Sequence, residues 1–152
     1  MKTLSMWLGI AALIASQANA ADERDLARLD AASRLWQGVQ SGDYEYRYQK
    51  FCECYQGDPP TTVVEVRNGR VDRVYHLHGD SDREVPARDG SDDLYWTVED
   101  LFSKLRTAYS KDATVRVEYD PSRGYPVSLF IDYDASFTGD ETDLRLTGFE
   151  RF

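Results

Sequence analysis

The chain has 152 residues, of which 18 are basic and 27 acidic, so its formal net charge is −9 with neutral histidines. A surplus of that sign repels the phosphates of nucleic acids and anionic membrane surfaces, so we expect no binding to either through charge. A chain of this length can bury about two thirds of its unfolded surface in one core. The composition therefore indicates one soluble domain that attracts cations or basic partners.

The first 20 residues have the pattern of a secretory signal peptide. Lys2 precedes an apolar stretch over residues 4–15, and Ala18-Asn19-Ala20 supplies the small residues that signal peptidase requires. The stretch is shorter than the roughly 20 apolar residues of a spanning helix. We therefore expect cleavage after Ala20, with residues 21–152 forming a single domain in the periplasm or outside the cell. Neither cysteine lies in the signal segment, so we expect no lipid anchor, and no membrane span after cleavage.

Apolar residues recur every three to four positions from Asp22 to Gln40, which predicts an amphipathic helix. Its buried stripe is expected to contain Leu26, Leu29, Ala32, Leu35 or Trp36, and Val39.

Three strands are predicted next. Tyrosines alternate with polar residues from Tyr44 to Tyr48, the two-residue period of a half-buried strand that continues to Cys52. Residues 61–67 and 70–78 flank Asn68-Gly69, a dipeptide that suits the positive φ angles of a tight hairpin turn. With a two-residue loop, one core-facing side of this hairpin would carry Val64, Val66, Val71, Tyr75 and Leu77.

The second half repeats the pattern of a helix followed by strands. Residues 79–93 are polar without an apolar period and predict a long loop, after which Thr97 and Asp100 form a capping box for a helix over residues 98–110. A hairpin over residues 115–133 and a last strand with a bulge at Gly148 follow. The sequence thus predicts an α+β fold, with two amphipathic helices packed on one face of a mainly antiparallel sheet of about six strands.

Several motifs together resemble an uncharacterised family of bacterial exported proteins and lipoproteins. They are a helix ending in Trp36, Cys52-Glu53-Cys54, Asn68-Gly69, Thr97-Val98-Glu99-Asp100-Leu101-Phe102, Gly124-Tyr125-Pro126 and Asp140-Glu141. The resemblance implies an α+β fold in an envelope or secreted protein and brings no assigned activity. This chain differs from the lipoprotein members because it lacks a lipid-attachment cysteine.

Cys52 and Cys54 are the only cysteines, and an oxidising compartment favours a bond between them. Residues two apart in a strand have Cα atoms roughly 6.5 Å apart, so the bond requires a local bend. We predict an intramolecular disulfide. The alternatives are a redox-active thiol pair, which Glu53 disfavours by opposing the thiolate, buried thiols, or a bond between chains.

His76 and His78 are the only histidines, and with the cysteines they suggest a Cys2His2 zinc site. The predicted alternation places both histidines opposite the core-facing side, whereas cysteines that continue the tyrosine face would project to the core. Even on one side, strand 61–67 would hold the two pairs about 10 Å apart. We therefore expect two exposed strand histidines.

An acidic segment near the end imitates the spacing of a calcium loop. Phe137 stands where such loops have glycine, and the bidentate glutamate is replaced by Asp143, so an acidic turn between strands is the favoured interpretation. The candidate calcium ligands are Asp132, Asp134, Ser136, Asp140 and Asp143.

Signatures of enzymes are missing, since no glycine-rich phosphate loop, nucleophile elbow or metalloprotease motif occurs. We expect non-enzymatic binding of an unknown protein or envelope partner, or support of the envelope, without a cofactor other than calcium. The alternatives are a thiol redox protein and a calcium-stabilised module. Aromatic residues expected in loops could line the recognition surface: Tyr55, Tyr95, Trp96 and Tyr125.

Overall fold

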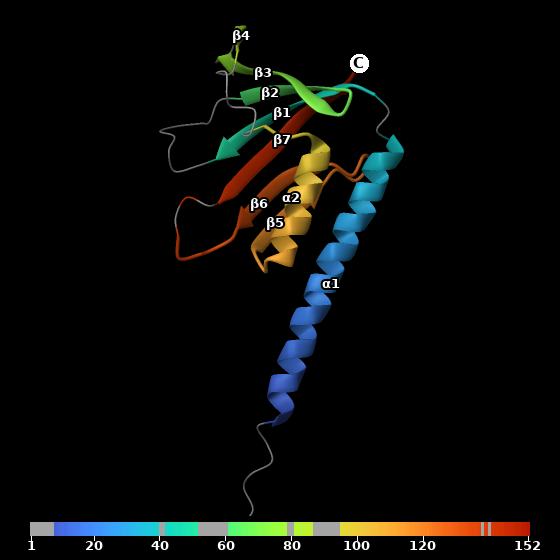
Figure 1. The fold of residues 1–152 in the computed structure, drawn as a ribbon, viewed down its shortest axis with the longest axis vertical. Coiled ribbons are helices and arrows are strands. Elements are labelled where there is room, and N and C mark those ends of the chain that lie inside the picture. Colours follow the sequence, from blue (N-terminus) through green and yellow to red (C-terminus); the bar gives the residue numbers. More distant parts are fainter. Residues whose placement is uncertain are drawn as a thin grey trace, which may run out of the picture.

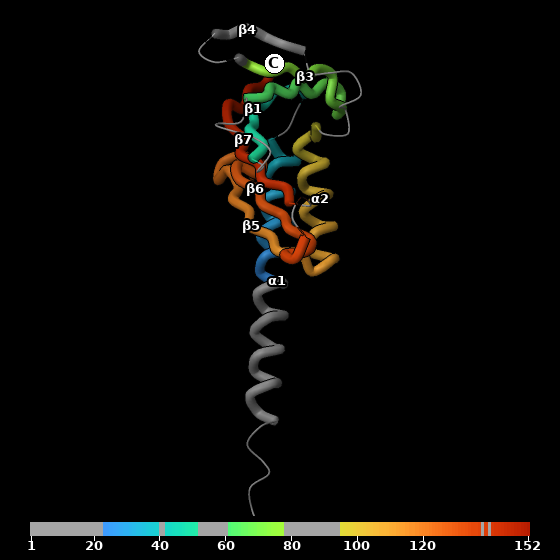
Figure 2. The backbone as a smooth tube through the Cα atoms, turned by 90° about the vertical axis from the view of Figure 1, so that its left-hand side faces the viewer, coloured from blue at the N-terminus to red at the C-terminus, as the bar shows by residue number. Residues whose placement is uncertain are grey.

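The computed structural model describes residues 8–39, 42–51, 61–78, 81–86, 95–137, 139 and 141–152, and for residues 8–22, 78 and 81–86 it describes the backbone alone. Within these ranges two helices lie on one face of a seven-stranded antiparallel sheet (Figures 1 and 2), which confirms the α+β fold. The helices are α1 (Leu8–Val39) and α2 (Val98–Ser110). The strands are β1 (Tyr44–Phe51), β2 (Thr61–Arg67), β3 (Arg70–His78), β4 (Ser81–Pro86), β5 (Thr114–Tyr119), β6 (Pro126–Asp132) and β7 (Thr142–Arg151).

The order of the strands is β4-β3-β2-β1-β7-β6-β5, so the last strand of the chain lies in the interior of the sheet. β4 falls in the segment that the sequence predicts as a loop, and that prediction was wrong there. The strand pairs with β3 through its backbone, while its sequence Ser-Asp-Arg-Glu-Val-Pro has no alternation of apolar and polar residues that could indicate it.

α1 is longer than the sequence predicts, because it begins at Leu8 rather than near Asp22. The predicted cut after Ala20 falls within this helix, and cleavage there stays a prediction. Trp36, not Leu35, belongs to the buried stripe together with Leu29 and Ala32. The side chains of Leu26 and Leu35 are 40% and 39% exposed, so neither is the core residue that the periodicity suggested.

The β2–β3 hairpin has the predicted turn, in which Asn68 and Gly69 adopt φ angles of 51° and 71°. Arg67 pairs with Arg70 and Val66 with Val71, as expected. The register then shifts, because Glu65 pairs with Arg73 and leaves one extra residue in β3.

This bulge reverses the predicted facing of the rest of β3. Val74 pairs with Val64 on the core face, while Tyr75 pairs with Val63 on the other face, so Tyr75 and Leu77 do not share the core side as predicted. His76 takes the core side instead, where its Nδ1 lies 3.0 Å from Thr62 Oγ1. The expectation that His76 faces away from the core was therefore wrong.

The predicted capping box of α2 is present. The Asp100 amide donates to Thr97 Oγ1 at 3.1 Å, and the Thr97 amide donates to Asp100 Oδ2 at 2.9 Å. Because two of the unpaired N–H groups at the start of the helix are satisfied in this way, α2 has a fixed beginning at Val98. Its buried face consists of Val98, Leu101, Phe102, Leu105 and Ala108.

The predicted bulge at Gly148 is also confirmed. Gly148 has φ 60°, and the β1–β7 register shifts between Glu45 and Arg47, opposite this residue. A glycine with positive φ at this point is typical of a bulge that bends one strand. Beyond it, the Phe149 ring stacks on the Tyr44 ring with centroids 5.4 Å apart, so the bulge turns Phe149 toward the core.

Candidate functional site

A polar cluster joins both helices to the sheet. Trp36 Nε1 of α1 donates to Glu99 Oε1 of α2 at 2.7 Å, and the Tyr44 hydroxyl of β1 donates to Glu99 Oε2 at 3.0 Å. The Val98 amide in turn donates to the Tyr44 hydroxyl at 3.0 Å. Burial, assisted by the charge of Glu99, raises the pKa of Tyr44 well above its usual range, so the phenol stays protonated. Trp36 and Tyr44 are inaccessible to solvent, whereas Glu99 is exposed, and the cluster connects α1, α2 and β1.

The turn between β5 and β6 lies directly against α1. Gly124 has φ 83°, and a Cβ atom there would lie 2.3 Å from the Ala32 carbonyl oxygen. The carboxylate of Asp120 accepts hydrogen bonds from the amides of Ser122 and Arg123. Burial raises the pKa of Asp120, but the hydrogen bonds lower it by more, so that the pKa lies below its usual value. Glycine is required because the turn and the helix backbone touch at this position.

Of the four aromatic residues predicted on a partner surface, Tyr125 is buried. It is only 6% exposed, and its ring stacks on Phe149 at 5.0 Å between centroids, so it belongs to the core rather than to a recognition surface. The prediction failed because the turn that carries Tyr125 packs against α1.

Tyr95 and Trp96 are half-buried in the segment that leads into α2. The Trp96 carbonyl accepts a hydrogen bond from the Tyr46 hydroxyl, and Lys104 Nζ lies 4.3 Å from the centre of the Trp96 ring. Tyr55 lies outside the described residues. A partner role for Tyr55, Tyr95 and Trp96 stays a prediction.

Two of the predicted calcium ligands, Asp132 and Asp134, organise a turn, whereas Asp143 lies on β7. Asp132 Oδ1 accepts from the Asp134 amide at 3.0 Å, and Asp134 Oδ1 accepts from the Ser136 amide at 2.9 Å. Hydrogen bonds from Ser136 lower the pKa of Asp134. Asp140 lies outside the described residues, and within the described part no three His, Cys, Asp or Glu side chains are grouped to hold a metal ion. Calcium binding by this loop stays a prediction.

Cys52 and Cys54 lie outside the described residues, and the bond between them stays a prediction. The side chain of His78 is likewise outside what the structure describes.

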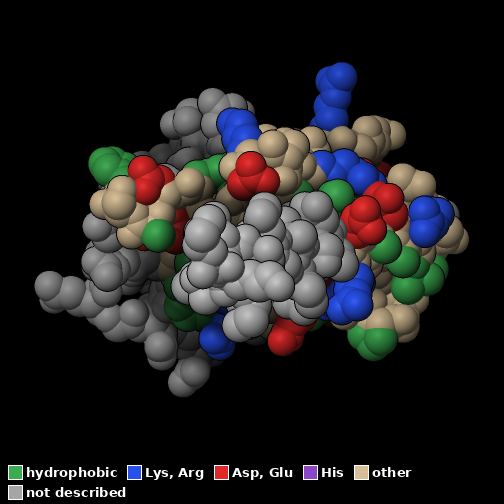
Figure 3. Space-filling model, turned by 90° about the horizontal axis from the view of Figure 1, so that it is seen from below, with side chains coloured by type: hydrophobic (Ala, Val, Ile, Leu, Met, Phe, Trp, Pro, Cys, Tyr) green, Lys and Arg blue, Asp and Glu red, His purple; other side chains and the backbone are tan. Residues whose placement is uncertain are grey.

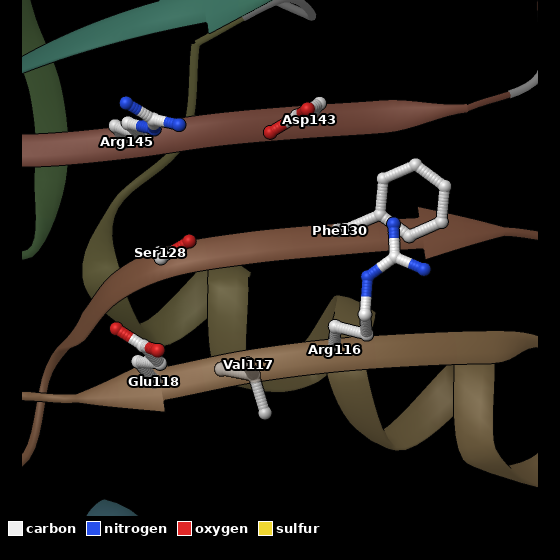
Figure 4. Close-up of a pocket in the computed structure, with 7 residues that line it drawn as sticks. All are labelled: Arg116, Val117, Glu118, Ser128, Phe130, Asp143 and Arg145. Carbon is white, nitrogen blue, oxygen red and sulfur yellow. The ribbon is translucent and has the colours of Figure 1, made fainter.

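The side chains that converge on an open surface lie on the other face of the sheet, over β5, β6 and β7. The register sets them in two rows across the strands: Arg116, Phe130 and Asp143 in one, and Glu118, Ser128 and Arg145 in the other. Together with Val117 they line a hollow of about 250 Å³ (Figure 4). We call these six side chains the charged face.

Aromatic rings hold the two arginines of the charged face. Arg116 Cζ lies 4.0 Å from the centre of the Phe130 ring, and Arg145 Cζ lies 4.9 Å from that of Phe51. A guanidinium stacked on a ring keeps its N–H edge available for a carboxylate.

Among the residues that the structure describes, the four charges of this face have no carboxylate or arginine partner. In the described part of the chain, no ion pair involves Arg116, Glu118, Asp143 or Arg145. At the far end of the same sheet, by contrast, Glu65 Oε1 is 3.2 Å from Arg73 Nη1. For other described charges, such as Arg24 and Arg34 of α1, the described residues likewise form no ion pair, so what distinguishes the β5–β7 end is the arrangement of its four charges around Phe130.

Both signs of charge are mixed elsewhere on the surface as well. Figure 3, seen from below, shows Lys and Arg side chains interspersed with Asp and Glu side chains. The net negative charge of the chain is therefore not gathered into a single acidic patch on the part visible there.

The charged face offers groups that form ion pairs and hydrogen bonds. It offers two guanidinium groups, two carboxylates, a phenyl ring and one hydroxyl, that of Ser128. Its lining contains no histidine or cysteine that could act as the base or nucleophile beside Ser128. Within the described residues, the groups of this face are thus suited to ion pairs and hydrogen bonds.

Two helices on one side of an antiparallel sheet and a charged surface on the other define an α+β domain. The chain belongs to a family of unknown function, DUF6174, whose model matches residues 28–151. The resemblance to an uncharacterised domain family is thereby confirmed, whereas a bacterial origin and the individual motifs stay predictions. No curated protein and no solved structure matches the chain significantly. In the part of the chain that the structure describes, no helix has the length and apolar character needed to cross a membrane.

Proposed function

We propose that the protein is an exported domain that binds another protein through the charged face and catalyses no reaction. The observation that carries this proposal is the set of four charges around Phe130, on the side of the sheet opposite the helices, which form no ion pair with any described residue. Leaving charges without partners on a folded domain serves recognition when a partner supplies the opposite charges.

The composition of the charged face supports a protein as the partner. Arginine and aromatic residues are enriched in protein interfaces, and here Arg116 and Arg145 each stack on a phenylalanine. The groups are spread over three neighbouring strands rather than enclosed between elements. A surface of this kind matches an extended partner better than a small molecule, which is usually surrounded by its site.

Export is supported by the sequence of residues 1–20, with a basic start, an apolar stretch and small residues before Ala21. An exported domain would meet its partner in the periplasm or outside the cell. The predicted disulfide between Cys52 and Cys54 agrees with that compartment.

Cross-linking in cells that express the full chain tests the binding function. The face variant carries Arg116→Glu and Arg145→Glu, and the control carries Arg24→Glu and Arg34→Glu on the exposed side of α1, with the same change in net charge. We expect wild type and control to capture the same protein species, and the face variant to lose them. Capture of one set of species by all three chains would contradict the proposal. Fractionation of the same cells shows whether the protein leaves the cytoplasm.

A further inference from the structure

We propose that the partner on the charged face is a second copy of this chain, bound face to face about a two-fold axis. This inference rests on the proposed function, because it requires that the charged face binds protein, and it adds the identity of that protein.

The charges form a rectangle in which neighbouring corners have opposite signs. Arg116 and Glu118 occupy β5, whereas Asp143 and Arg145 occupy β7, and the pairing through β6 sets Arg116 level with Asp143 and Glu118 level with Arg145. Adjacent strands are about 4.8 Å apart, and alternate residues of a strand are about 7 Å apart. The corners are therefore separated by about 10 Å across the strands and about 7 Å along them.

This arrangement is complementary to itself. A two-fold axis along β6, between two stacked sheets, lays Arg116 over Asp143 of the partner subunit and Glu118 over Arg145 of the partner subunit. The same operation repeats both contacts in the reverse sense, so four ion pairs form. Phe130 then meets the partner's Phe130 at the centre.

The other two-fold axis in the plane, across the strands, is complementary too. It lays Arg116 over the partner's Glu118 and Asp143 over the partner's Arg145. Stacked sheets are about 10 Å apart, which leaves room for the arginine and phenylalanine side chains between them. In neither orientation do like charges meet, so the pairing of two copies does not depend on a single exact alignment.

Alternating signs also select against other partners. A protein surface of uniform charge would meet two of the four corners with repulsion, and like charges in contact oppose binding strongly. Only a partner with the same alternation at the same spacing satisfies all four corners. An identical copy of the chain carries that pattern by necessity.

Exchange of charges tests the inference. One variant, with Arg116→Glu and Arg145→Glu, makes all four corners acidic, and the other, with Glu118→Arg and Asp143→Arg, makes them basic. In sedimentation equilibrium of the full purified protein, we expect wild type and the Arg24→Glu, Arg34→Glu control to form dimers. Each face variant alone is expected to be a monomer, and an equimolar mixture of the two to form dimers again.

Folding is checked first by circular dichroism and thermal melting of each variant. If a charge reversal unfolds the chain, the milder substitutions Arg145→Gln and Glu118→Gln are used instead. Each is expected to raise the dissociation constant of the dimer about tenfold, because a symmetric dimer loses the same ion pair at two places.

A monomeric wild type at millimolar concentration would overturn the inference, as would dimers of the all-acidic variant or a mixture of folded variants that stays monomeric. A monomeric wild type that still captures a different protein through Arg116 and Arg145 would reject the second copy and keep the binding function. If the face variants capture the same species as wild type and the wild type is monomeric, both proposals fail.

Discussion

Trp36 and Glu99 lie 63 residues apart in the sequence, and the indole Nε1 of the first donates a hydrogen bond to Oε1 of the second at 2.7 Å. This contact links α1 to the first turn of α2. Since the other carboxylate oxygen of Glu99 accepts from Tyr44 of β1, one side chain connects three elements of the fold. The carboxylate also lies near the start of α2, where the helix dipole favours a negative charge.

Glu99→Gln is expected to lower the free energy of unfolding by about 1–3 kcal/mol, because Trp36 and Tyr44 donate to different carboxylate oxygens and an amide has a donor NH2 group in place of one of them. Urea unfolding measures the loss. Glu150→Gln, at an exposed position of β7, is the control and is expected to change the unfolding midpoint little. Equal effects of the two substitutions would contradict the role of Glu99.

The stability of the protein is expected to decrease above pH 10. Burial raises the pKa of Tyr46 far above its usual value, so the unfolded chain releases the phenolic proton at a pH where the folded chain retains it. The contribution of Tyr46 is therefore complete below about pH 10 and is lost as the pH rises further, at about 1.4 kcal/mol per pH unit.

Urea midpoints from about pH 7, where tyrosines are protonated, to about pH 11, above their usual pKa, check this slope. Tyr46→Phe should make the decrease less steep, whereas Tyr133→Phe, at an exposed position, should leave it as in wild type. A midpoint that falls equally in all three chains would show that Tyr46 does not cause the decrease.

Gly124→Ala is expected to destabilise the protein more than Gly69→Ala does. Both glycines have positive φ, which costs an L-residue about 1–2 kcal/mol. A Cβ atom at Gly69 meets open space, whereas at Gly124 it would overlap the Ala32 carbonyl oxygen and push the turn away from α1. Thermal unfolding compares the two variants, since Gly69→Ala introduces backbone strain alone and Gly124→Ala introduces backbone strain and the overlap with Ala32. Equal melting temperatures would refute the contact between the turn and α1.

The mass of the native protein is expected to correspond to a chain that begins at Ala21 and lacks two hydrogen atoms, because the leader is removed and Cys52 bonds to Cys54. Mass spectrometry of the protein from cells, before and after reduction and alkylation, measures both features. Retention of Met1 would contradict cleavage. Modification of both thiols without a reductant would contradict the disulfide.

Local periodicity was sufficient to predict most elements of this fold. The Asn68-Gly69 turn, the Thr97–Asp100 capping box and the bulge at Gly148 each depend on residues that are close in the sequence, and all three are present. β4 was missed because pairing of backbones stabilises a strand whose side chains carry no pattern. The bulge in β3 was missed because it depends on how β3 pairs with β2, and it reversed the facing of His76.

The charged face was not predicted from the sequence, which suggested only Asp143 among its residues, as a calcium ligand. The outward positions of β5 follow from the alternation of Arg116 and Glu118 with valines, and those of β7 from Asp143 and Arg145 on either side of Leu144. Their convergence requires the order β7-β6-β5, which no short stretch of sequence specifies. Tyr125, in contrast, was taken for a surface residue because nothing local shows that its turn contacts α1.

The interior place of β7 in the sheet also affects when the chain can fold. The first strand, β1, pairs with β7 at the far end of the sequence, and the β5–β6 hairpin joins the sheet only through β7. A chain still being synthesised lacks this interior strand until residues 142–151 have been made, and pairing over such long separations is slow. Before that point the β5–β6 hairpin has no neighbour in the sheet, so closure of the sheet is a late step, which is compatible with the export proposed above.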